Sequence, residues 1–292
     1  MRKKLFALFL LCMCPMVTFA SENTYYTNKY QIGMTEEQYQ NLKEQGFSDF
    51  EIEYMTEEEF NKRKDIEATL EATSEQYYKK EIKQDGTVVE SIVTEEEYEN
   101  FDPSMSDVGL YSLVTGYVET TMLKVTTTIS EVDSQNYMFK TTMESKLIPT
   151  VRHYDIIGIG FSNSSIYAES DTMEQYDTTC YMTSGTCTTA SSPYFKVFET
   201  GIGAKYTLDT SLFAETILSR LYYNVRKLSS AGTITQLDAY GWYRHATSNS
   251  VTAAQSNTFT VTKNGISFSS SSVDANFDEL PAASHARWNG SW

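Results

Sequence analysis

Histidine is the scarcest catalytic side chain in this sequence, with three copies at His153, His245 and His285. A serine or cysteine nucleophile needs a histidine base and a turn that presents it, and the Gly-x-Ser-x-Gly signature of such a turn is absent. The run 158–162 (GIGFS) superficially resembles a nucleophile or phosphate loop, but a serine-rich stretch follows it instead of a helix. We interpret it as the end of a buried strand.

His153 and Asp155 are two residues apart, so on an extended strand they face the same way. They could pair with each other or bind a metal ion together, but two ligands are too few to specify zinc. Because no spaced histidine or cysteine completes the set, the sequence predicts no metal site and no cofactor. A surface pair is the simpler interpretation, and for His245 the simpler interpretation is a hydrogen bond across strands.

Carboxylates are abundant, with 39 Asp and Glu residues, and a glycoside hydrolase needs two of them at a set separation. Those that fall in predicted strands are Glu119, Glu144, Asp155 and Asp238. No spacing singles out a dyad among them, so the sequence predicts no catalytic residue.

The strongest binding signal is the aromatic group Tyr240, Trp242 and Tyr243. On a strand Tyr240 and Trp242 face the same way, and such a pair on an open sheet face can stack on sugar rings or contact a protein. The competing interpretation is that these large rings belong to the core. We predict a binding site made of Tyr240, Trp242, Tyr243 and His245.

The cysteine pattern predicts one disulfide. Cys12 and Cys14 belong to the N-terminal apolar run, which leaves Cys180 and Cys187 on either side of a Ser-Gly turn. A disulfide across this hairpin suits an exported protein, and two free thiols are the alternative.

The first twenty residues have the organisation of a secretory signal peptide. A basic start at residues 2–4 is followed by an apolar run over residues 5–17, and Thr18 and Ala20 supply the small residues of a cleavage site. Cleavage between Ala20 and Ser21 would give a secreted, extracellular protein with no membrane span.

The formal net charge is −16 at pH 7, and the acidic excess is concentrated in residues 21–107. An acidic surface repels phosphate groups, which argues against nucleic acid and anionic membranes as partners. A cell-surface, glycan or protein partner remains compatible with this charge.

Residues 21–66 predict an acidic segment of short helices. Capping boxes begin at Thr35, Ser48 and Thr56, and Gly46 ends the first helix. Apolar side chains between these caps are spaced so that three short helices share a small core. Because so few residues bury too little surface to fold stably alone, we expect the segment either to be marginally stable or to dock on the rest of the chain.

Residues 67–109 predict a hairpin and linker, with strands over 77–83 and 87–93 joined by an Asp85-Gly86 turn. From about residue 110 the glutamates thin out and threonine, serine, tyrosine and valine dominate. Alternating strands are predicted over 117–130 and 137–147, and the apolar run 155–161 predicts a buried central strand whose glycines allow close approach of another backbone.

The segment 213–228 has both helical and strand periodicity. Because a turn and a strongly β stretch follow, we interpret it as one arm of a hairpin with residues 233–247. A further hairpin is predicted over 259–268, and residues 281–292 are expected to form a loose tail. The predicted fold is mainly β, with an antiparallel β-sandwich over residues 110–280 preceded by the small α-helical acidic segment.

Two blocks, 149–158 (PTVRHYDIIG) and 243–248 (YRHATS), together with the Thr-Glu-Glu helical N-terminus, resemble uncharacterised exported β-rich proteins of Gram-positive bacteria. The resemblance covers most of the chain after the signal peptide. It implies a secreted protein of Gram-positive origin, and it implies no activity, substrate or site residue.

Together these features favour a secreted, non-enzymatic protein that acts by binding or surface association. The competing hypothesis is a secreted hydrolase with an unrecognised active site, which would need a pocket that encloses His153 or His245 with a carboxylate. A third hypothesis is that the acidic segment is a pro-region or inhibitor released by proteolysis.

Overall fold

The computed structural model describes residues 24–82, 87–102, 119–146, 151–181, 184–191, 194–209, 211, 214–248 and 250–292. The predicted signal peptide, with its cleavage site at Ala20 and Ser21, lies outside these residues, and so does the predicted Asp85-Gly86 turn. The described chain is mainly β and its sheets are antiparallel, as the sequence predicts. None of the helices in these ranges has the length and hydrophobicity that crossing a bilayer requires.

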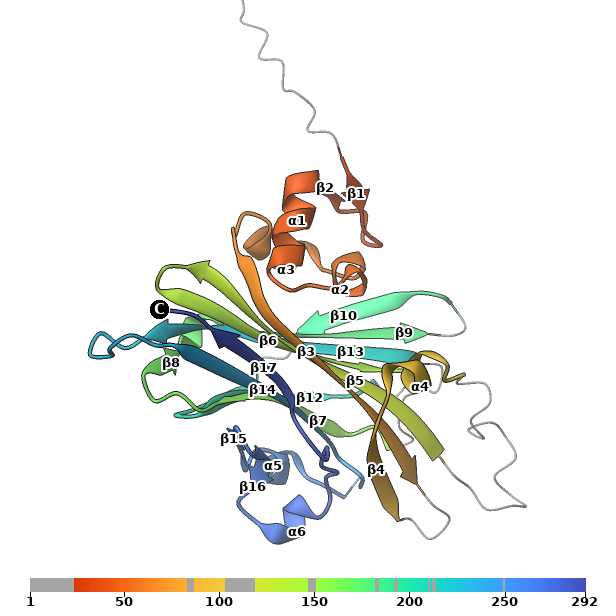
Figure 1. Cartoon of the computed structure of the whole chain (residues 1–292). Coiled ribbons are helices and arrows are strands. Elements are labelled where there is room, and N and C mark those ends of the chain that lie inside the picture. The colour runs from red at the N-terminus through yellow and green to blue at the C-terminus, as the bar shows by residue number, and fades with distance from the viewer. Residues whose placement is uncertain are drawn as a thin grey trace, which may run out of the picture.

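The elements stack in four layers (Figure 1). A layer of short helices lies on a large sheet, the large sheet faces a smaller sheet, and a cap of one hairpin and two short helices lies on the far side of the smaller sheet. A separate cluster of buried apolar side chains fills each of the three spaces between the layers.

The first layer, which we call the helical layer, comprises residues 24–66. Its elements are β1 (Tyr26–Thr27), β2 (Gly33–Met34), α1 (Glu36–Glu44), α2 (Asp49–Glu53) and α3 (Glu57–Arg63). Thr35 and Ser48 make the predicted capping boxes. The Thr56 hydroxyl accepts a hydrogen bond from the Glu59 backbone N–H at 3.2 Å, but the Glu59 carboxylate turns toward the sheet instead of back to the cap.

The large sheet has the strand order β10-β9-β13-β6-β5-β3-β4, with β8 also paired to β13. Its strands are β3 (Thr69–Ile82), β4 (Val88–Val93), β5 (Glu119–Asp133), β6 (Asn136–Ser145), β8 (Ile166–Ala168), β9 (Glu174–Tyr181), β10 (Cys187–Ser191) and β13 (Ala214–Lys227). Helix α4 (Glu95–Glu99) packs on this sheet through Tyr98, which contacts Tyr77, and a single 3-10 turn, η2 (Ser170–Thr172), precedes β9. The β3–β4 and β5–β6 hairpins are those that the sequence predicts.

The smaller sheet has the order β11-β12-β7-β14-β17. Its strands are β7 (Tyr154–Phe161), β11 (Phe195–Phe198), β12 (Gly201–Thr207), β14 (Gln236–His245) and β17 (Ser284–Asn289). Side chains of both sheets meet in one cluster, in which Phe139 and Met143 of the large sheet and Ile157 and Ile159 of the smaller sheet are each 0% exposed. Alternation along each strand therefore directs one face of each sheet into this shared core.

The cap comprises α5 (Ala253–Ser256), β15 (Phe259–Thr262), β16 (Gly265–Phe268) and α6 (Ser271–Asp274), and β15 and β16 form the predicted hairpin. It lies directly on glycines of β7 and β12. A Cβ added to Gly160 would be 2.2 Å from the Thr262 carbonyl oxygen, and one added to Gly203 would be 2.6 Å from the Phe259 ring. The predicted close approach of another backbone to β7 is confirmed.

Strand pairing differs from the sequence-based expectation in two places. The large sheet begins before residue 110, because β3 pairs with β5 along most of its length and β4 pairs with β3. The strand assignment for 213–228 is correct, but the expected hairpin with 233–247 is wrong: β13 pairs with β6 and β9 in one sheet, and β14 pairs with β7 and β17 in the other. Residues 228–235 carry the chain from one sheet to the other.

The C-terminal residues 281–292, expected to be loose, are ordered by the smaller sheet. They contain β17, which pairs with β14, and the ring of Trp292 packs at 4.8 Å from the ring of Tyr137. The polar composition of this segment concealed its alternation, since Ser284, Ala286 and Trp288 are buried and the residues between them are not.

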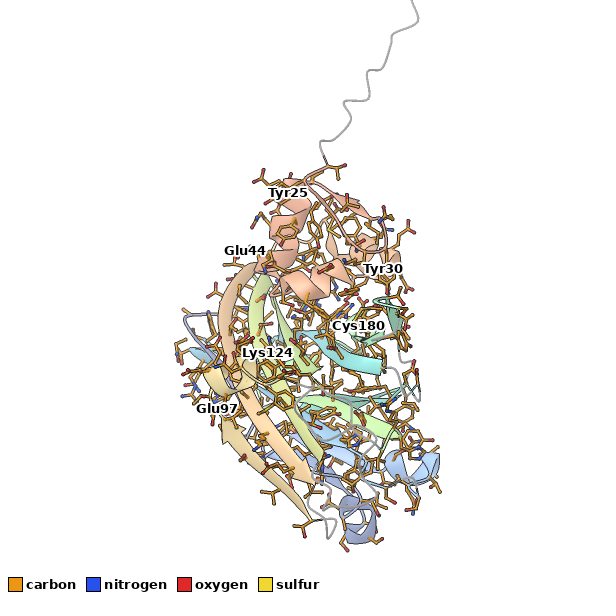
Figure 2. The ribbon with its side chains drawn as sticks, turned by 90° about the vertical axis from the view of Figure 1, so that its right-hand side faces the viewer. Tyr25, Tyr30, Glu44, Glu97, Lys124 and Cys180 are labelled. Atoms are coloured by element: carbon orange, nitrogen blue, oxygen red, sulfur yellow. A yellow bond between two sulfur atoms is a disulfide. The ribbon has the colours of Figure 1, made fainter. Side chains whose placement is uncertain are left out.

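Buried ion pairs fasten the helical layer to the large sheet. Figure 2 shows the short helices of this layer lying against the strands of that sheet. The Glu51 carboxylate accepts hydrogen bonds from Lys140 Nζ at 2.6 and 2.7 Å. The Glu59 carboxylate accepts two hydrogen bonds from the Arg220 guanidinium and a third from the Tyr222 hydroxyl at 3.1 Å. Because an unpaired buried charge is costly, the acidic helices and the basic sheet residues depend on each other.

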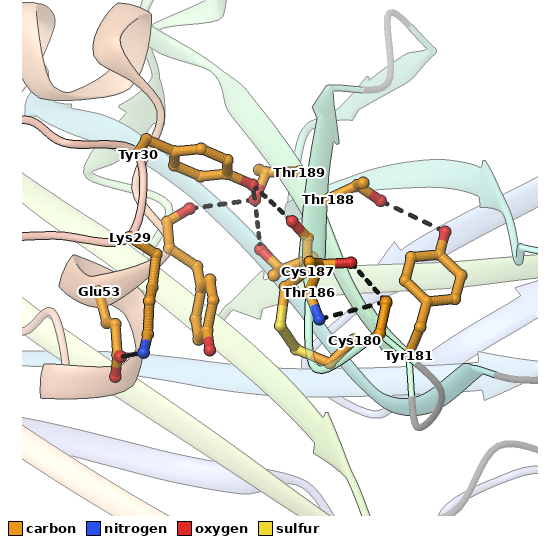
Figure 3. Close-up of a disulfide and its surroundings, with 12 residues drawn as sticks. Lys29, Tyr30, Glu53, Cys180, Tyr181, Thr186, Cys187, Thr188 and Thr189 are labelled. Carbon is orange, nitrogen blue, oxygen red and sulfur yellow. Dashed lines mark hydrogen bonds and ion pairs between the residues drawn. A yellow bond between two sulfur atoms is a disulfide. The ribbon is translucent and has the colours of Figure 1, made fainter.

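The predicted disulfide joins Cys180 and Cys187, which stand directly opposite each other on β9 and β10 (Figure 3). The β10 strand also contacts the helical layer. The Tyr30 hydroxyl donates to Thr189 Oγ1 at 3.1 Å, and Thr189 Oγ1 donates to the Tyr54 carbonyl at 3.0 Å. In the chain-entropy model, a disulfide that closes a loop as short as that between Cys180 and Cys187 contributes about 2–3 kcal/mol to the free energy of unfolding.

We expect Gly160→Ala to lower the free energy of unfolding by about 1–3 kcal/mol, because the added methyl group meets the backbone of Thr262. The matched control is Gly232→Ala, where a Cβ has nothing within 4 Å and stability should change little. Urea unfolding of both variants tests this. Equal stability of the two would contradict the close packing of the cap on β7.

We expect Glu59→Ala to lower the free energy of unfolding by about 3–5 kcal/mol, because it leaves the Arg220 guanidinium buried without its carboxylate. Glu58→Ala is the control, since the Glu58 side chain is 71% exposed and pairs only with Lys62 among the described residues. Chemical denaturation followed by circular dichroism measures both. A loss no larger than that of the control would mean that the helical layer is not held through this pair.

Candidate functional site

The predicted aromatic group on β14 divides between the two faces of the smaller sheet. Tyr240 and Trp242 face the cap, and Tyr243 faces the core between the sheets. Trp242 is 8% exposed and packs with Phe259 and Val261 beneath the cap hairpin. The open aromatic platform expected here is therefore covered, because the cap that follows β14 in sequence folds back over it.

Tyr240 is the one predicted binding residue of the four that is not buried. Its ring stacks on the His285 imidazole, with centroids 4.2 Å apart and planes inclined by 11°. Asp238 Oδ1 lies 2.7 Å from His285 Nε2 and accepts a hydrogen bond from Arg287 Nε, also at 2.7 Å. Despite burial, hydrogen bonds from these two neighbours and from Gln236 lower the pKa of Asp238. Tyr240 is thus held by neighbours inside the protein.

His245 and Asp155 form a closed pair in the core. His245 Nδ1 lies 2.7 Å from Asp155 Oδ1, the Tyr243 hydroxyl donates to Asp155 Oδ2, and the two members of the pair are 1% and 0% exposed. Burial, and then the nearby Asp155 charge, raise the pKa of Tyr243 well above its usual value, so its hydroxyl stays a donor. The predicted cross-strand hydrogen bond of His245 is present, with Asp155 as partner.

This pair has the residue types of a catalytic His–Asp couple, but a substrate cannot reach it. Neither residue lines any of four surface hollows in the described part of the chain, two of which are described below. A substrate must come within hydrogen-bond reach of a general base, and here both members of the pair are almost completely buried. The geometry fits a role in fixing the strands better than a role in catalysis.

The His153–Asp155 pair expected from sequence does not form. His153 Nε2 lies 2.5 Å from the Val251 carbonyl oxygen, and its ring packs on Tyr154, while Asp155 pairs with His245. Within the described part of the chain, no three His, Cys, Asp or Glu side chains gather as metal ligands would.

The strand carboxylates considered as a hydrolytic dyad have separate partners. Glu144 pairs with Lys124 at 3.1 Å, Asp155 with His245, and Asp238 with Arg287. The side chain of Glu119 lies outside the described residues. The structure therefore brings none of the described three together as an acid–base pair.

A hollow beside β8 is lined by an exposed aromatic side chain. It has a volume of about 310 Å³ and lies between the end of β7, the strand β8 and the turn that follows β11. Tyr167 and Val197 line it and are 40% and 47% exposed. Apolar side chains make up part of the remaining lining, and the polar side chains in it are Ser162, Asn163, Ser164, Glu199 and Thr200. An exposed ring beside hydroxyl, amide and carboxylate groups is a recognition surface for a small polar ligand.

A second hollow of about 620 Å³ adjoins the first and shares Tyr167 and Leu228 with it. Trp292 and Arg226 line its other sides. Tyr167 stands directly opposite Arg226 in the β8–β13 pair, and the hydrogen bond that the Arg226 guanidinium donates to the Tyr167 hydroxyl raises the pKa of Arg226. This contact orients the ring at the border of the two hollows.

Sequence analysis missed this site because β8 has only three residues, too few to show a period. The available signal was an aromatic residue, Tyr167, two positions after the serine- and asparagine-rich run 162–165. Such a run marks a loop, and an aromatic side chain at a loop end is more often exposed than one inside a strand.

No protein-family model and no curated protein matches this sequence. Among solved structures, the chain is similar to the crystal structure of the collagen binding domain of the Erysipelothrix rhusiopathiae surface protein RspB, with 6% sequence identity and a TM-score of 0.26. The match covers 59% of this chain and 66% of that domain, so the chain spans less than two thirds of its length. At this TM-score the likeness carries no argument about function, which must come from the geometry above.

We expect Asp155→Ala to lower the free energy of unfolding by about 3 kcal/mol or more, because it leaves His245 Nδ1 and the Tyr243 hydroxyl buried without their acceptor. Asp65→Ala is the control, since the Asp65 side chain is 74% exposed. Thermal unfolding of both variants measures the difference. An unchanged midpoint, with loss of turnover on an ester, peptide or glycan substrate, would instead identify the pair as catalytic.

Proposed function

We propose that this chain is a secreted, non-enzymatic protein that binds a glycan through the Tyr167 hollow. The observation that carries the proposal is the half-exposed Tyr167 ring at the border of two adjoining hollows of about 310 and 620 Å³. The proposal takes the two antiparallel sheets and their common core as a β-sandwich, a rigid frame from which the loops of the site extend.

The size and lining of the hollow favour a sugar over a protein as ligand. Small-ligand sites have volumes of about 300–1,000 Å³, whereas stable protein interfaces are flatter and bury about 800 Å² on each partner. A tyrosine face stacks on the apolar face of a sugar ring, and Ser162, Ser164 and Glu199 supply donors and acceptors for its hydroxyl groups. The acidic net charge of −16 favours a neutral or basic glycan over an anionic one.

Secretion and a Gram-positive origin are part of the proposal. The N-terminal signal pattern and the Cys180–Cys187 disulfide support export, because disulfides persist in oxidising compartments. The resemblance of residues 149–158 and 243–248 to exported Gram-positive proteins supports the origin. The buried pairs Glu51–Lys140 and Glu59–Arg220 support retention of the acidic segment as part of the working protein rather than its release as a pro-region.

We expect Tyr167→Ala to weaken glycan binding at least about tenfold while leaving the unfolding temperature unchanged, because the ring contributes stacking at an exposed position. The first measurement is a screen of the wild-type protein on an array of neutral and basic bacterial and host glycans. Titration of the best ligand against wild type and variant by calorimetry then gives the ratio of affinities.

Tyr25→Ala is the matched control, because Tyr25 is 55% exposed but lies in the helical layer, outside the described hollows. It should bind as the wild type does. If the Tyr167→Ala variant and the wild-type protein bind the best ligand with equal affinity, the site lies elsewhere. If the wild-type protein binds no glycan of the array, the proposed function is wrong.

A further inference from the structure

Lys80, Glu90 and Asp278 meet at the edge of the large sheet. Lys80 on β3 and Glu90 on β4 are direct cross-strand partners, so their side chains leave the same face. Asp278 comes from the segment between α6 and β17, and its Oδ2 accepts a hydrogen bond from Lys80 Nζ. The Lys80 and Asp278 side chains are only 4% and 6% exposed, so water scarcely reaches the contact.

The Asp278 carboxyl group is fixed on its other side by backbone. The His245 backbone N–H donates to Asp278 Oδ1 at 2.7 Å, and the Asp278 backbone N–H donates to the His245 carbonyl at 3.0 Å. Arg244 Nε donates to the Asp278 carbonyl at 2.6 Å. These contacts leave Oδ2 directed at the lysine, while Oδ1 already has a hydrogen-bond donor.

Glu90 differs from the other two groups in carrying a proton at neutral pH. Its Oε1 is buried and makes no hydrogen bond with any described residue. Burial first, and then the Asp278 charge, raise the pKa of Glu90 to about 8. A neutral carboxyl group beside a lysine and a carboxylate is able to pass protons between them.

We propose that Lys80 and Asp278 become joined by an intramolecular amide bond between Lys80 Nζ and Asp278 Cγ, with Glu90 as the proton relay. The inference is independent of the glycan site. It concerns a covalent modification that the protein performs on itself, for which the three side chains supply every group required.

The reaction balances without any other reactant. The Lys80 ammonium group loses one proton through Glu90 to the Asp278 carboxyl group, and the neutral amine then attacks Cγ. The negative charge that develops on Oδ1 is stabilised by the His245 N–H. A second proton passes from the nitrogen through Glu90 to Oδ2, and the C–Oδ2 bond breaks to release one water molecule. Glu90 ends with the proton it had at the start, and the amide nitrogen keeps one hydrogen.

Amide formation from an ammonium and a carboxylate does not proceed in water, because the two groups seldom meet in a reactive geometry and water reverses the reaction. The site removes both obstacles. Fixed side chains in contact react with effective molarities of about 10⁵–10⁸ M. The buried surroundings hold little water to reverse the reaction, since both reacting side chains are almost fully buried. The bond would connect residues 198 positions apart and tie the large sheet to the segment that leads into β17.

Lys140 and Glu51 provide an internal control. They are as deeply buried as Lys80 and Asp278, and their nitrogen and oxygen atoms lie 2.6 Å apart. The nearby carboxylate of Glu59 is held in its ion pair with Arg220, so it is not free to relay protons at this site. The pair should remain an ion pair.

The test is the mass of the full chain, measured after denaturation, disulfide reduction and determination of its N-terminal residue. We expect a mass lower by one water molecule than the sequence requires, and a branched peptide after proteolysis that joins residues 80 and 278. Residues 51 and 140 should appear in linear peptides. An unmodified wild-type mass, or a water loss that maps to a linear peptide, would overturn the proposal.

Three variants separate the roles of the groups. Lys80→Arg and Asp278→Asn, each produced separately and compared with the wild-type protein, test the two reacting side chains. Lys80→Arg should have the full mass, because a guanidinium is not nucleophilic. Glu90→Gln should have the full mass or gain the bond more than tenfold more slowly, as followed by mass spectrometry over time, and circular dichroism checks that it is folded. A folded Glu90→Gln that loses water at the wild-type rate would contradict the relay.

Asp278→Asn should lose ammonia instead of water if it reacts, and water loss in that variant would show that the bond lies elsewhere.

Discussion

The arrangement depends on one constraint: both sheets are covered on both faces. Each strand directs alternate side chains to opposite faces, so a sheet with apolar residues on both faces needs a layer on either side. The large sheet has the smaller sheet on one face and the helical layer on the other, and the smaller sheet has the cap on its far face. The short helices and the cap hairpin are therefore structural parts of the fold, because each is too small to be stable without the sheet beneath it.

Covering both faces also buries polar groups, and each buried group needs a partner. On the helical side the partners are acid and base, as in Glu59 with Arg220, and in the core they are Asp155 with His245 and Tyr243. Pairs of this kind contribute little net stability compared with apolar residues of the same volume, but a pair with one member missing is strongly unfavourable. We therefore attribute the acidic composition of residues 21–66 partly to this docking: Glu51 and Glu59 are required by Lys140 and Arg220, whereas most other glutamates of the segment face solvent.

Local features of the fold could be predicted from sequence, and features that depend on distant segments could not. The caps at Thr35 and Ser48, the β5–β6 hairpin and the Cys180–Cys187 disulfide involve residues close in the chain, so their patterns are complete within a short window. The partners of β13 and β14 are chosen by sheets assembled from remote strands, and period-two alternation does not specify them.

The candidate site shows the same limit. A strand pattern establishes that Tyr240 and Trp242 share a face, but it does not establish which layer lies on that face. Here the cap covers Trp242, and the exposed ring is Tyr167, on a strand of three residues. The glycines of β7 carried the missing information, since a strand that lacks side chains on one face has another backbone against it.

The position of β17 has a consequence for how the chain acquires its structure. This strand completes the edge of the smaller sheet, and the Ser284 hydroxyl donates to the Ser74 carbonyl, a contact that spans 210 residues. The first strands of the large sheet pair among themselves, but the smaller sheet cannot close until residues 284–289, near the other end of the chain, have been synthesised. Such distant contacts slow folding. Until β17 pairs with it, the edge of β14 is open, and an open strand edge can associate with other chains.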